Sequence, residues 1–93
     1  MFTGIIEQIA EVVKVESEGS NVHITLKSTI TVELKIDQSV AHNGVCLTVV
    51  AINGDEYVVT AIKETLEKSN IGLLEVGSKV NMERCLKVGG RLD

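Results

Sequence analysis

The chain has 93 residues, of which 44% are hydrophobic and 24% charged, and its 13 acidic and 9 basic residues give a formal net charge of −4. This length suits one domain, and the composition excludes a disordered tail. The acidic charge and the scarcity of aromatic residues exclude a nucleic-acid binder. No apolar run approaches the about 20 residues of a membrane-spanning helix, and the N-terminus lacks the basic and apolar stretches of a signal peptide. We therefore expect a cytoplasmic domain that contacts neither nucleic acid nor membrane.

The first part of the chain predicts two antiparallel strands. Residues 22–28 alternate between apolar and polar side chains and have high β propensity, and the turn cluster 18–21 precedes them. Residues 2–16 fit both a helical and a strand period, but a hairpin with 22–28 favours a strand for residues 6–16. Residues 29–38 are less regular, and we expect a turn at Asp37-Gln38.

The middle of the chain predicts a tight turn and a further hairpin. Residues 39–41 lead into Asn43-Gly44, a dipeptide that tolerates the positive φ of a tight turn. The runs 45–52 and 56–62 are rich in β-branched and apolar residues and flank Asn53-Gly54. An Asn-Gly pair between two such runs is the strongest short hairpin signal that a sequence offers.

The last part predicts a short helix and a final strand. Residues 63–70 are rich in helix formers, residues 75–78 form a turn, and residues 79–86 alternate as a strand would. Several short strands with one short helix predict an all-β fold, a small closed or nearly closed antiparallel barrel.

Five side chains deserve separate interpretation before any family is considered. Cys46 and Thr48 leave the same face of their strand because they are two residues apart. A strand cysteine is most often a small buried hydrophobe, which favours the core for both Cys46 and Cys85. We expect His42 to be a turn residue bonded to neighbouring backbone, and His23 to lie on the solvent face of its strand.

Three segments together resemble the riboflavin synthase family: residues 1–6 (MFTGII), residues 39–50 (SVAHNGVCLTVV) and residues 63–66 (KETL). The resemblance covers essentially the whole chain and is to the N-terminal half of these lumazine-binding enzymes. It implies a six-stranded antiparallel Greek-key closed barrel with one or two short helices. Because the family has two such barrels in tandem, residues 1–93 are expected to be a single barrel, without the second.

The resemblance also implies which residues bind a ribityllumazine or a flavin. Gly4 allows a ring to approach the backbone, and Thr48 offers a hydrogen-bond donor and acceptor. The resemblance implies that Cys46 lines the pocket instead of the core. It also makes Cys46 the one candidate catalytic residue, for acceptor-side binding or water activation. The implied binding residues are Gly4, Ile5, Ile6, Cys46, Leu47, Thr48, Thr60, Ala61, Ile62, Lys63, Glu64 and Thr65. No metal site is expected.

In the family the reaction is the dismutation of two molecules of 6,7-dimethyl-8-ribityllumazine to riboflavin and 5-amino-6-ribitylamino-pyrimidinedione, without an external cofactor. Each active site is assembled from two barrels of different subunits, so one barrel supplies half a site. We therefore expect weak or no activity from this half alone. We also expect a homodimer of this half, and a homotrimer for the full-length family. The alternative is a non-catalytic carrier of lumazine or flavin.

Overall fold

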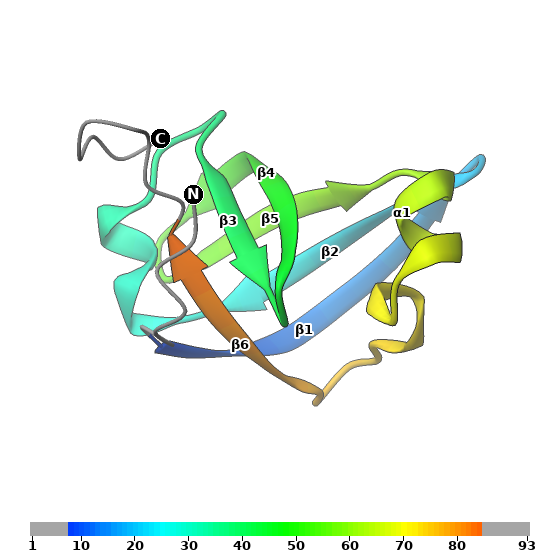
Figure 1. The fold of residues 1–93 in the computed structure, drawn as a ribbon. Coiled ribbons are helices and arrows are strands. Elements are labelled where there is room, and N and C mark those ends of the chain that lie inside the picture. Colours follow the sequence, from blue (N-terminus) through cyan, green and yellow to red (C-terminus); the bar gives the residue numbers. More distant parts are fainter. Residues whose placement is uncertain (1–7, 85–93) are drawn as a thin grey trace, which may run out of the picture.

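The computed structural model describes residues 8–84, which form six strands closed into a barrel (Figure 1). The strands are β1 (Gln8–Glu18), β2 (Asn21–Lys27), β3 (Ser39–His42), β4 (Val45–Asn53), β5 (Glu56–Ala61) and β6 (Lys79–Arg84). Their order around the barrel is β1-β2-β5-β4-β3-β6, and all neighbouring pairs are antiparallel. The connections from β2 to β3 and from β5 to β6 pass over intervening strands. The predicted fold class, an antiparallel Greek-key barrel, is confirmed.

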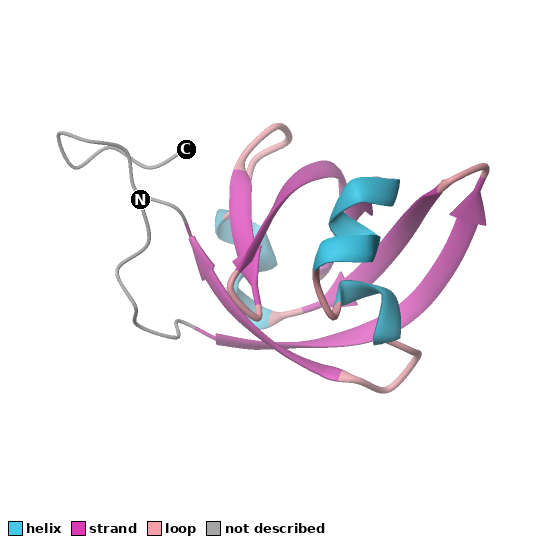
Figure 2. Ribbon diagram, turned by 45° about the vertical axis from the view of Figure 1, so that its right-hand side comes forward, coloured by secondary structure: helices cyan, strands magenta, loops and turns pink. Residues whose placement is uncertain are grey.

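Two helical connections lie at opposite ends of the barrel (Figure 1). The β2–β3 connection contains the 3₁₀ helix η1 (Thr29–Glu33), whose first turn is capped by the Ser28 hydroxyl accepting from the Ile30 amide. The β5–β6 connection contains α1 (Lys63–Lys68) and the 3₁₀ helix η2 (Ile71–Leu73), and Figure 2 shows the two stacked beside the strands. The predicted helix is confirmed, although it ends at Lys68.

The barrel interior is filled by alternate side chains from every strand. Ile71 of η2 is also buried, at 1% exposure, so the α1–η2 connection adds an apolar side chain to the core. Each fully buried Val, Leu or Ile stabilises the fold by about 1.5–3 kcal/mol. The strand residues in the core are Ala10, Val12, Ile24, Leu26, Val40, Leu47, Val49, Tyr57, Val59, Ala61, Val80 and Met82.

The tight turns follow the predicted signals, with one correction. Asn43 and Gly44 link β3 to β4 with φ of 51° and 85°, as the sequence predicts. Asn53 instead pairs with Glu56, so the β4–β5 loop is Gly54-Asp55, with φ of 65° at the glycine. The prediction of Asn53-Gly54 as the loop was wrong by one residue, because Gly54 takes the first loop position. The register between β4 and β5 also shifts between Val49 and Ala51, which is a β-bulge.

The strand limits differ slightly from those expected. β1 continues to Glu18 because Glu18 pairs with Asn21 across the hairpin. The expected strand residues 6–7 and 85–86 lie outside the described residues. Within residues 8–84, no helix has the length and apolar character needed to cross a membrane.

Candidate functional site

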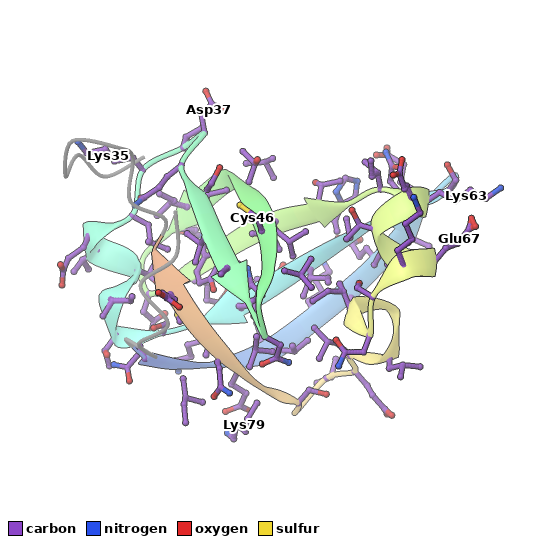
Figure 3. All side chains as sticks on the ribbon, in the orientation of Figure 1. Lys35, Asp37, Cys46, Lys63, Glu67 and Lys79 are labelled. Carbon is purple, nitrogen blue, oxygen red and sulfur yellow. The ribbon has the colours of Figure 1, made fainter. Side chains whose placement is uncertain are left out.

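The predicted site residues of β4 alternate between the core and the outside of the barrel. Cys46 and Thr48 are exposed, whereas Leu47 between them is only 5% exposed. Figure 3 shows Cys46 on β4 and Lys63 on α1. The prediction that Cys46 and Thr48 share a face is confirmed, and the interpretation of Cys46 as a core residue is wrong. Its apolar neighbours Leu47 and Val49 take the inward positions instead.

The predicted residues of β5 lie next to those of β4. Val49 pairs with Val59, and both are fully buried. The β4–β5 pairing ends at these two residues, and Thr48 and Thr60 are the next residues along their strands. Thr60 is partly exposed and Ile62, which is still extended, is 52% exposed. These outward side chains, Cys46, Thr48, Thr60 and Ile62, are called the outer β4–β5 face below.

A pocket of about 450 Å³ lies at the end of this face, between the β3–β4 turn and α1. Three predicted site residues, Ile62, Glu64 and Thr65, line it. The residues that complete its lining are Gly44, Val45, Lys68 and Ser69. This α1 pocket therefore contains residues of one predicted binding segment, 60–65, and the segment 46–48 begins next to its Val45 wall.

The polar groups of the α1 pocket come mainly from the helix. Glu64 accepts from Lys68 at 3.1 Å, because one helical turn brings residues four apart together. The Ser69 hydroxyl donates to the Thr65 carbonyl at 2.6 Å. The pocket thus combines charged and hydroxyl groups with the apolar wall of Ile62 and Val45, a mixture suited to a flat polar ring.

The β3–β4 turn that forms one wall of this pocket is fixed to β6. The amide of Asn43 donates to the carbonyl of Asn81 at 2.8 Å, and the amide of Asn81 donates to Oδ1 of Asn43 at 2.9 Å. Asn43 therefore supports the wall as well as the turn. Sequence analysis missed this second role, because only the fold brings Asn81 to the turn.

The remaining predicted site residues differ in what they can offer. Leu47 and Ala61 are buried in the core, so only their backbone can meet a ligand. Lys63 is exposed at the first position of α1. The residues of the first predicted segment lie outside the described residues: Gly4, Ile5 and Ile6.

His42 lies inside the barrel. Its Nδ1 is 3.0 Å from the Val40 carbonyl, so this nitrogen carries the proton, and its Nε2 accepts from the Tyr57 hydroxyl at 2.8 Å. The predicted bond to neighbouring backbone is confirmed. The expected turn position is wrong, because His42 ends β3 and is 1% exposed. Burial lowers the pKa of His42 from 6.5 to about 4 and raises the pKa of Tyr57, and the two form a structural pair.

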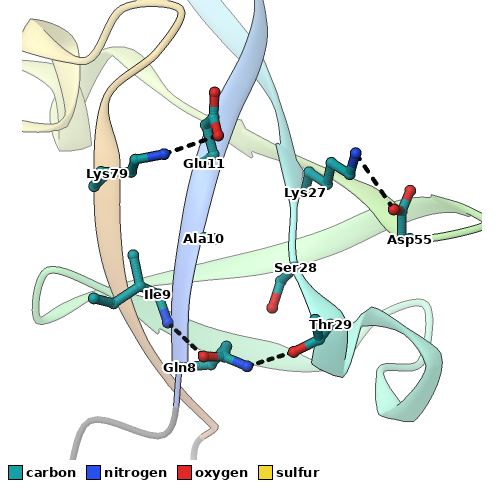
Figure 4. Close-up of a pocket in the computed structure, with 9 residues that line it drawn as sticks. All are labelled: Gln8, Ile9, Ala10, Glu11, Lys27, Ser28, Thr29, Asp55 and Lys79. Atoms are coloured by element: carbon teal, nitrogen blue, oxygen red, sulfur yellow. Dashed lines mark hydrogen bonds and ion pairs between the residues drawn. The ribbon is translucent and has the colours of Figure 1, made fainter.

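A second pocket, of about 340 Å³, lies where β1 diverges from β2 (Figure 4). Its charged groups already pair with one another: Lys79 with Glu11 at 2.8 Å, and Lys27 with Asp55 at 3.7 Å. The side chain of Gln8 also donates within the pocket, to Thr29. None of the described site residues predicted from the sequence lines it, so we assign the candidate site to the outer β4–β5 face and the α1 pocket.

Within the described part of the chain, no three His, Cys, Asp or Glu side chains are grouped to hold a metal ion. A closed barrel with an exposed polar strand face beside a pocket of this size defines a small-molecule-binding β-barrel. The model of the lumazine binding domain matches residues 3–85. The chain belongs to the lumazine-binding domain family.

Relatives and solved structures agree with this assignment. The chain is 43% identical over 95 residues to riboflavin synthase of Buchnera aphidicola subsp. Schizaphis graminum, covering 99% of this chain and 45% of the relative. It is 41% identical over 98 residues to riboflavin synthase of Escherichia coli (strain K12), covering 99% and 46%. The chain thus spans about half the length of the curated relatives that it matches.

Among solved structures, the chain is similar to LumP complexed with 6,7-dimethyl-8-(1'-D-ribityl) lumazine, with a TM-score of 0.86 and 27% identity over 100% of this chain and 52% of that one. It is also similar to LumP complexed with riboflavin, with a TM-score of 0.83 and 28% identity over 89% and 46%. The similarity extends over the whole barrel.

Proposed function

We propose that this chain is the N-terminal domain of a riboflavin synthase, a single barrel that binds 6,7-dimethyl-8-ribityllumazine and riboflavin. It supplies half of the site at which two lumazines are converted to riboflavin and 5-amino-6-ribitylamino-pyrimidinedione. The observation that carries the proposal is that the predicted segment 60–65 lines the α1 pocket with Ile62, Glu64 and Thr65, while the exposed side chains of Cys46 and Thr48, from the predicted segment 46–48, follow Val45 of the same pocket. Relatives named riboflavin synthase match the whole length of the chain.

The binding roles follow from the chemistry of the exposed groups. The outer β4–β5 face presents the hydroxyls of Thr48 and Thr60 beside the thiol of Cys46, and Ile62 offers an apolar contact for a flat ring. The α1 pocket adds the polar groups of Glu64 and the hydroxyl-bearing Thr65. The ribityl chain, which carries several hydroxyls, is the ligand part that suits those polar groups.

The reaction needs two ring systems held face to face, with a four-carbon unit passed from one lumazine to the other. One outer face holds one ring, so a second barrel must hold the other. We assign this role to another copy of the chain in a homodimer, or to the second barrel in the homotrimer of a full-length enzyme. A cytoplasmic location is part of the same proposal.

Cys46 is the one catalytic candidate that the barrel offers at this face. Its exposed position beside Thr48 allows the thiol to contact the acceptor ring or to hold a water molecule against it. No external cofactor is needed, because the lumazine ring itself stabilises the carbanion that forms at its acidic methyl group.

Riboflavin fluorescence titration tests the binding proposal directly. Riboflavin is excited and emits at visible wavelengths, where the protein does not absorb. We expect a saturable change in its emission with a Kd of about 10 μM or tighter. Absence of saturation in that range would refute the proposal.

The alternative is a carrier that binds lumazine or flavin without chemistry, and the similarity to LumP complexes keeps it in view. Incubation of the chain with 6,7-dimethyl-8-ribityllumazine, followed by chromatographic detection of riboflavin, separates the two. We expect slow formation of riboflavin that depends on protein concentration, because two barrels must meet. Formation of riboflavin would exclude a pure carrier, whereas binding without product is also the result expected of an inactive half-site.

A further inference from the structure

Three polar side chains on the outside of the barrel form a continuous hydrogen-bonded chain. Nε2 of His23 lies 2.7 Å from Oε1 of Glu18, and Nδ1 of His23 lies 2.8 Å from Oγ1 of Thr60. The three residues come from β1, β2 and β5, and His23 is the register partner of Thr60. Both ring nitrogens of His23 are therefore engaged, one on each neighbouring strand.

The Glu18 carboxylate fixes the direction of the first hydrogen bond, and with a neutral ring the direction of the second follows. An ionised carboxylate only accepts, so Nε2 of His23 carries the proton that it donates to Glu18. In the neutral ring Nδ1 is then an acceptor, and the Thr60 hydroxyl donates its single hydrogen to it. The Thr60 oxygen keeps its lone pairs, so toward a ligand Thr60 is a hydrogen-bond acceptor.

Thr60 belongs to the outer β4–β5 face, directly after the paired residue Val59 and two residues before Ile62 of the α1 pocket. His23 extends this polar row onto β2. Its side chain is 30% exposed, whereas that of Glu18 is 78% exposed, so the ring is held between a solvated carboxylate and the candidate site. His23 lies on the outer face as the sequence predicts, but its bond to a site residue could not be read from the sequence.

We infer that His23, held by Glu18, is a positioning residue that turns Thr60 into a dedicated acceptor for a donor group of the ligand. The inference rests on the proposed function, because Thr60 must face the bound ring or its side chain. The matching ligand groups are an imide N–H of the pyrimidinedione ring or a hydroxyl of the ribityl chain. A ligand that presents only acceptors to Thr60 is disfavoured, so the chain of three residues contributes specificity as well as affinity.

A double-mutant cycle on the 93-residue chain tests this inference, with riboflavin fluorescence as the measurement. Thr60→Val removes the hydroxyl while keeping the shape of the side chain, and we expect about three- to tenfold weaker binding. His23→Phe keeps a ring of similar size without hydrogen bonds, and we expect a comparable loss. In the double variant the loss should equal that of Thr60→Val alone, because His23 acts through Thr60.

Two further variants make the cycle specific. Thr60→Ser retains the hydroxyl and should keep binding within about twofold of the unmodified chain. Thr25→Val is the control, because it is also a threonine-to-valine substitution. Thr25 lies on β2 on the same side as His23, is partly exposed and does not line the α1 pocket, so Kd should be unchanged. Thermal unfolding followed by circular dichroism identifies any variant that has lost the fold.

The outcomes separate the inference from the proposed function. Failure of the unmodified chain to bind riboflavin overturns both. If the unmodified chain binds riboflavin normally but His23→Phe weakens binding equally with and without Thr60→Val, the inference alone is overturned. A His23→Phe loss that disappears in that background supports it.

Discussion

Acidification should destabilise the barrel through a single buried histidine, His42. Protonation would have to occur at Nε2, which accepts from the Tyr57 hydroxyl, and the new N–H would then face that hydroxyl inside the core. The alternative acceptor for the hydroxyl is the Met82 sulfur at 3.7 Å, which is a weak partner. The folded state therefore resists the proton that the unfolded chain readily binds.

The size of the effect follows from the two pKa values of His42. Burial lowers the pKa from 6.5 to about 4, and this difference corresponds to about 3 kcal/mol of unfolding free energy. Because the folded pKa is the lower one, the unfolded state binds more protons between these values, and stability falls as the pH falls. The contribution is complete above pH about 6.5, is reduced by about 2 kcal/mol at pH about 5, and is lost below pH about 4.

Urea unfolding at pH about 8 and about 5 measures this loss, with far-ultraviolet circular dichroism and Tyr57 fluorescence as two independent signals. In His42→Gln the unfolding free energy should differ much less between the two pH values, whatever the stability of this variant at pH about 8. His23→Gln is the matched control, because His23 is a partly exposed histidine on the outer face, and it should leave the difference in place. An unfolding free energy of the unmodified chain that stays constant between the two pH values would refute the reasoning.

Three further predictions concern the site and the buried pair. Thr48→Val should retain the fold but weaken riboflavin binding by about 1–3 kcal/mol, as measured by fluorescence titration, because a ligand group loses its partner. Tyr57→Phe should lower the unfolding free energy by about 1–3 kcal/mol in urea, because Nε2 of His42 is left buried without a donor. Gly44→Ala should cost about 1–2 kcal/mol in the same assay, because its φ of 85° disfavours any side chain even though open space surrounds it.

Each of these predictions has its own contradicting result. Unchanged affinity in Thr48→Val would remove that hydroxyl from the site, and unchanged stability in Tyr57→Phe would mean that His42 needs no donor. For Gly44→Ala the chain offers Gly72→Ala as the control, because Gly72 lacks a positive φ and a new methyl there would meet Leu66 at an ordinary 3.6 Å. Equal effects at both glycines would contradict the backbone explanation.

The fold was predictable because its signals are local. Alternating side chains and the Asn43-Gly44 turn define neighbouring strands without knowledge of the rest of the chain. The one-residue error at the next hairpin arose because both Asn53 and Gly54 tolerate turn geometry, and only the pairing of Asn53 with Glu56 decides between them.

The candidate site was only partly predictable, because it depends on pairing between distant strands. Cys46 lies in a run that is apolar at nearly every position, so alternation does not reveal its face, and residue preference wrongly favours the core. The bond between His23 and Thr60 joins residues 37 apart in the sequence and requires the β2–β5 register. The ion pair of Glu64 with Lys68, by contrast, follows from helical spacing alone.

The pair of hydrogen bonds between Asn43 and Asn81 has a consequence for how a ligand enters. A hairpin tip is ordinarily among the most mobile parts of a barrel, and a mobile tip must lose conformational entropy when a ring settles against it. Here two hydrogen bonds hold the Asn43-Gly44 turn against β6 without any ligand, so the turn loses its conformational entropy on folding and not on binding. At the proposed site we therefore expect a ligand to dock on a preformed edge, without closure of a loop. A truncation that removes Asn81 would release the Asn43-Gly44 turn, which lies 38 residues away in the sequence.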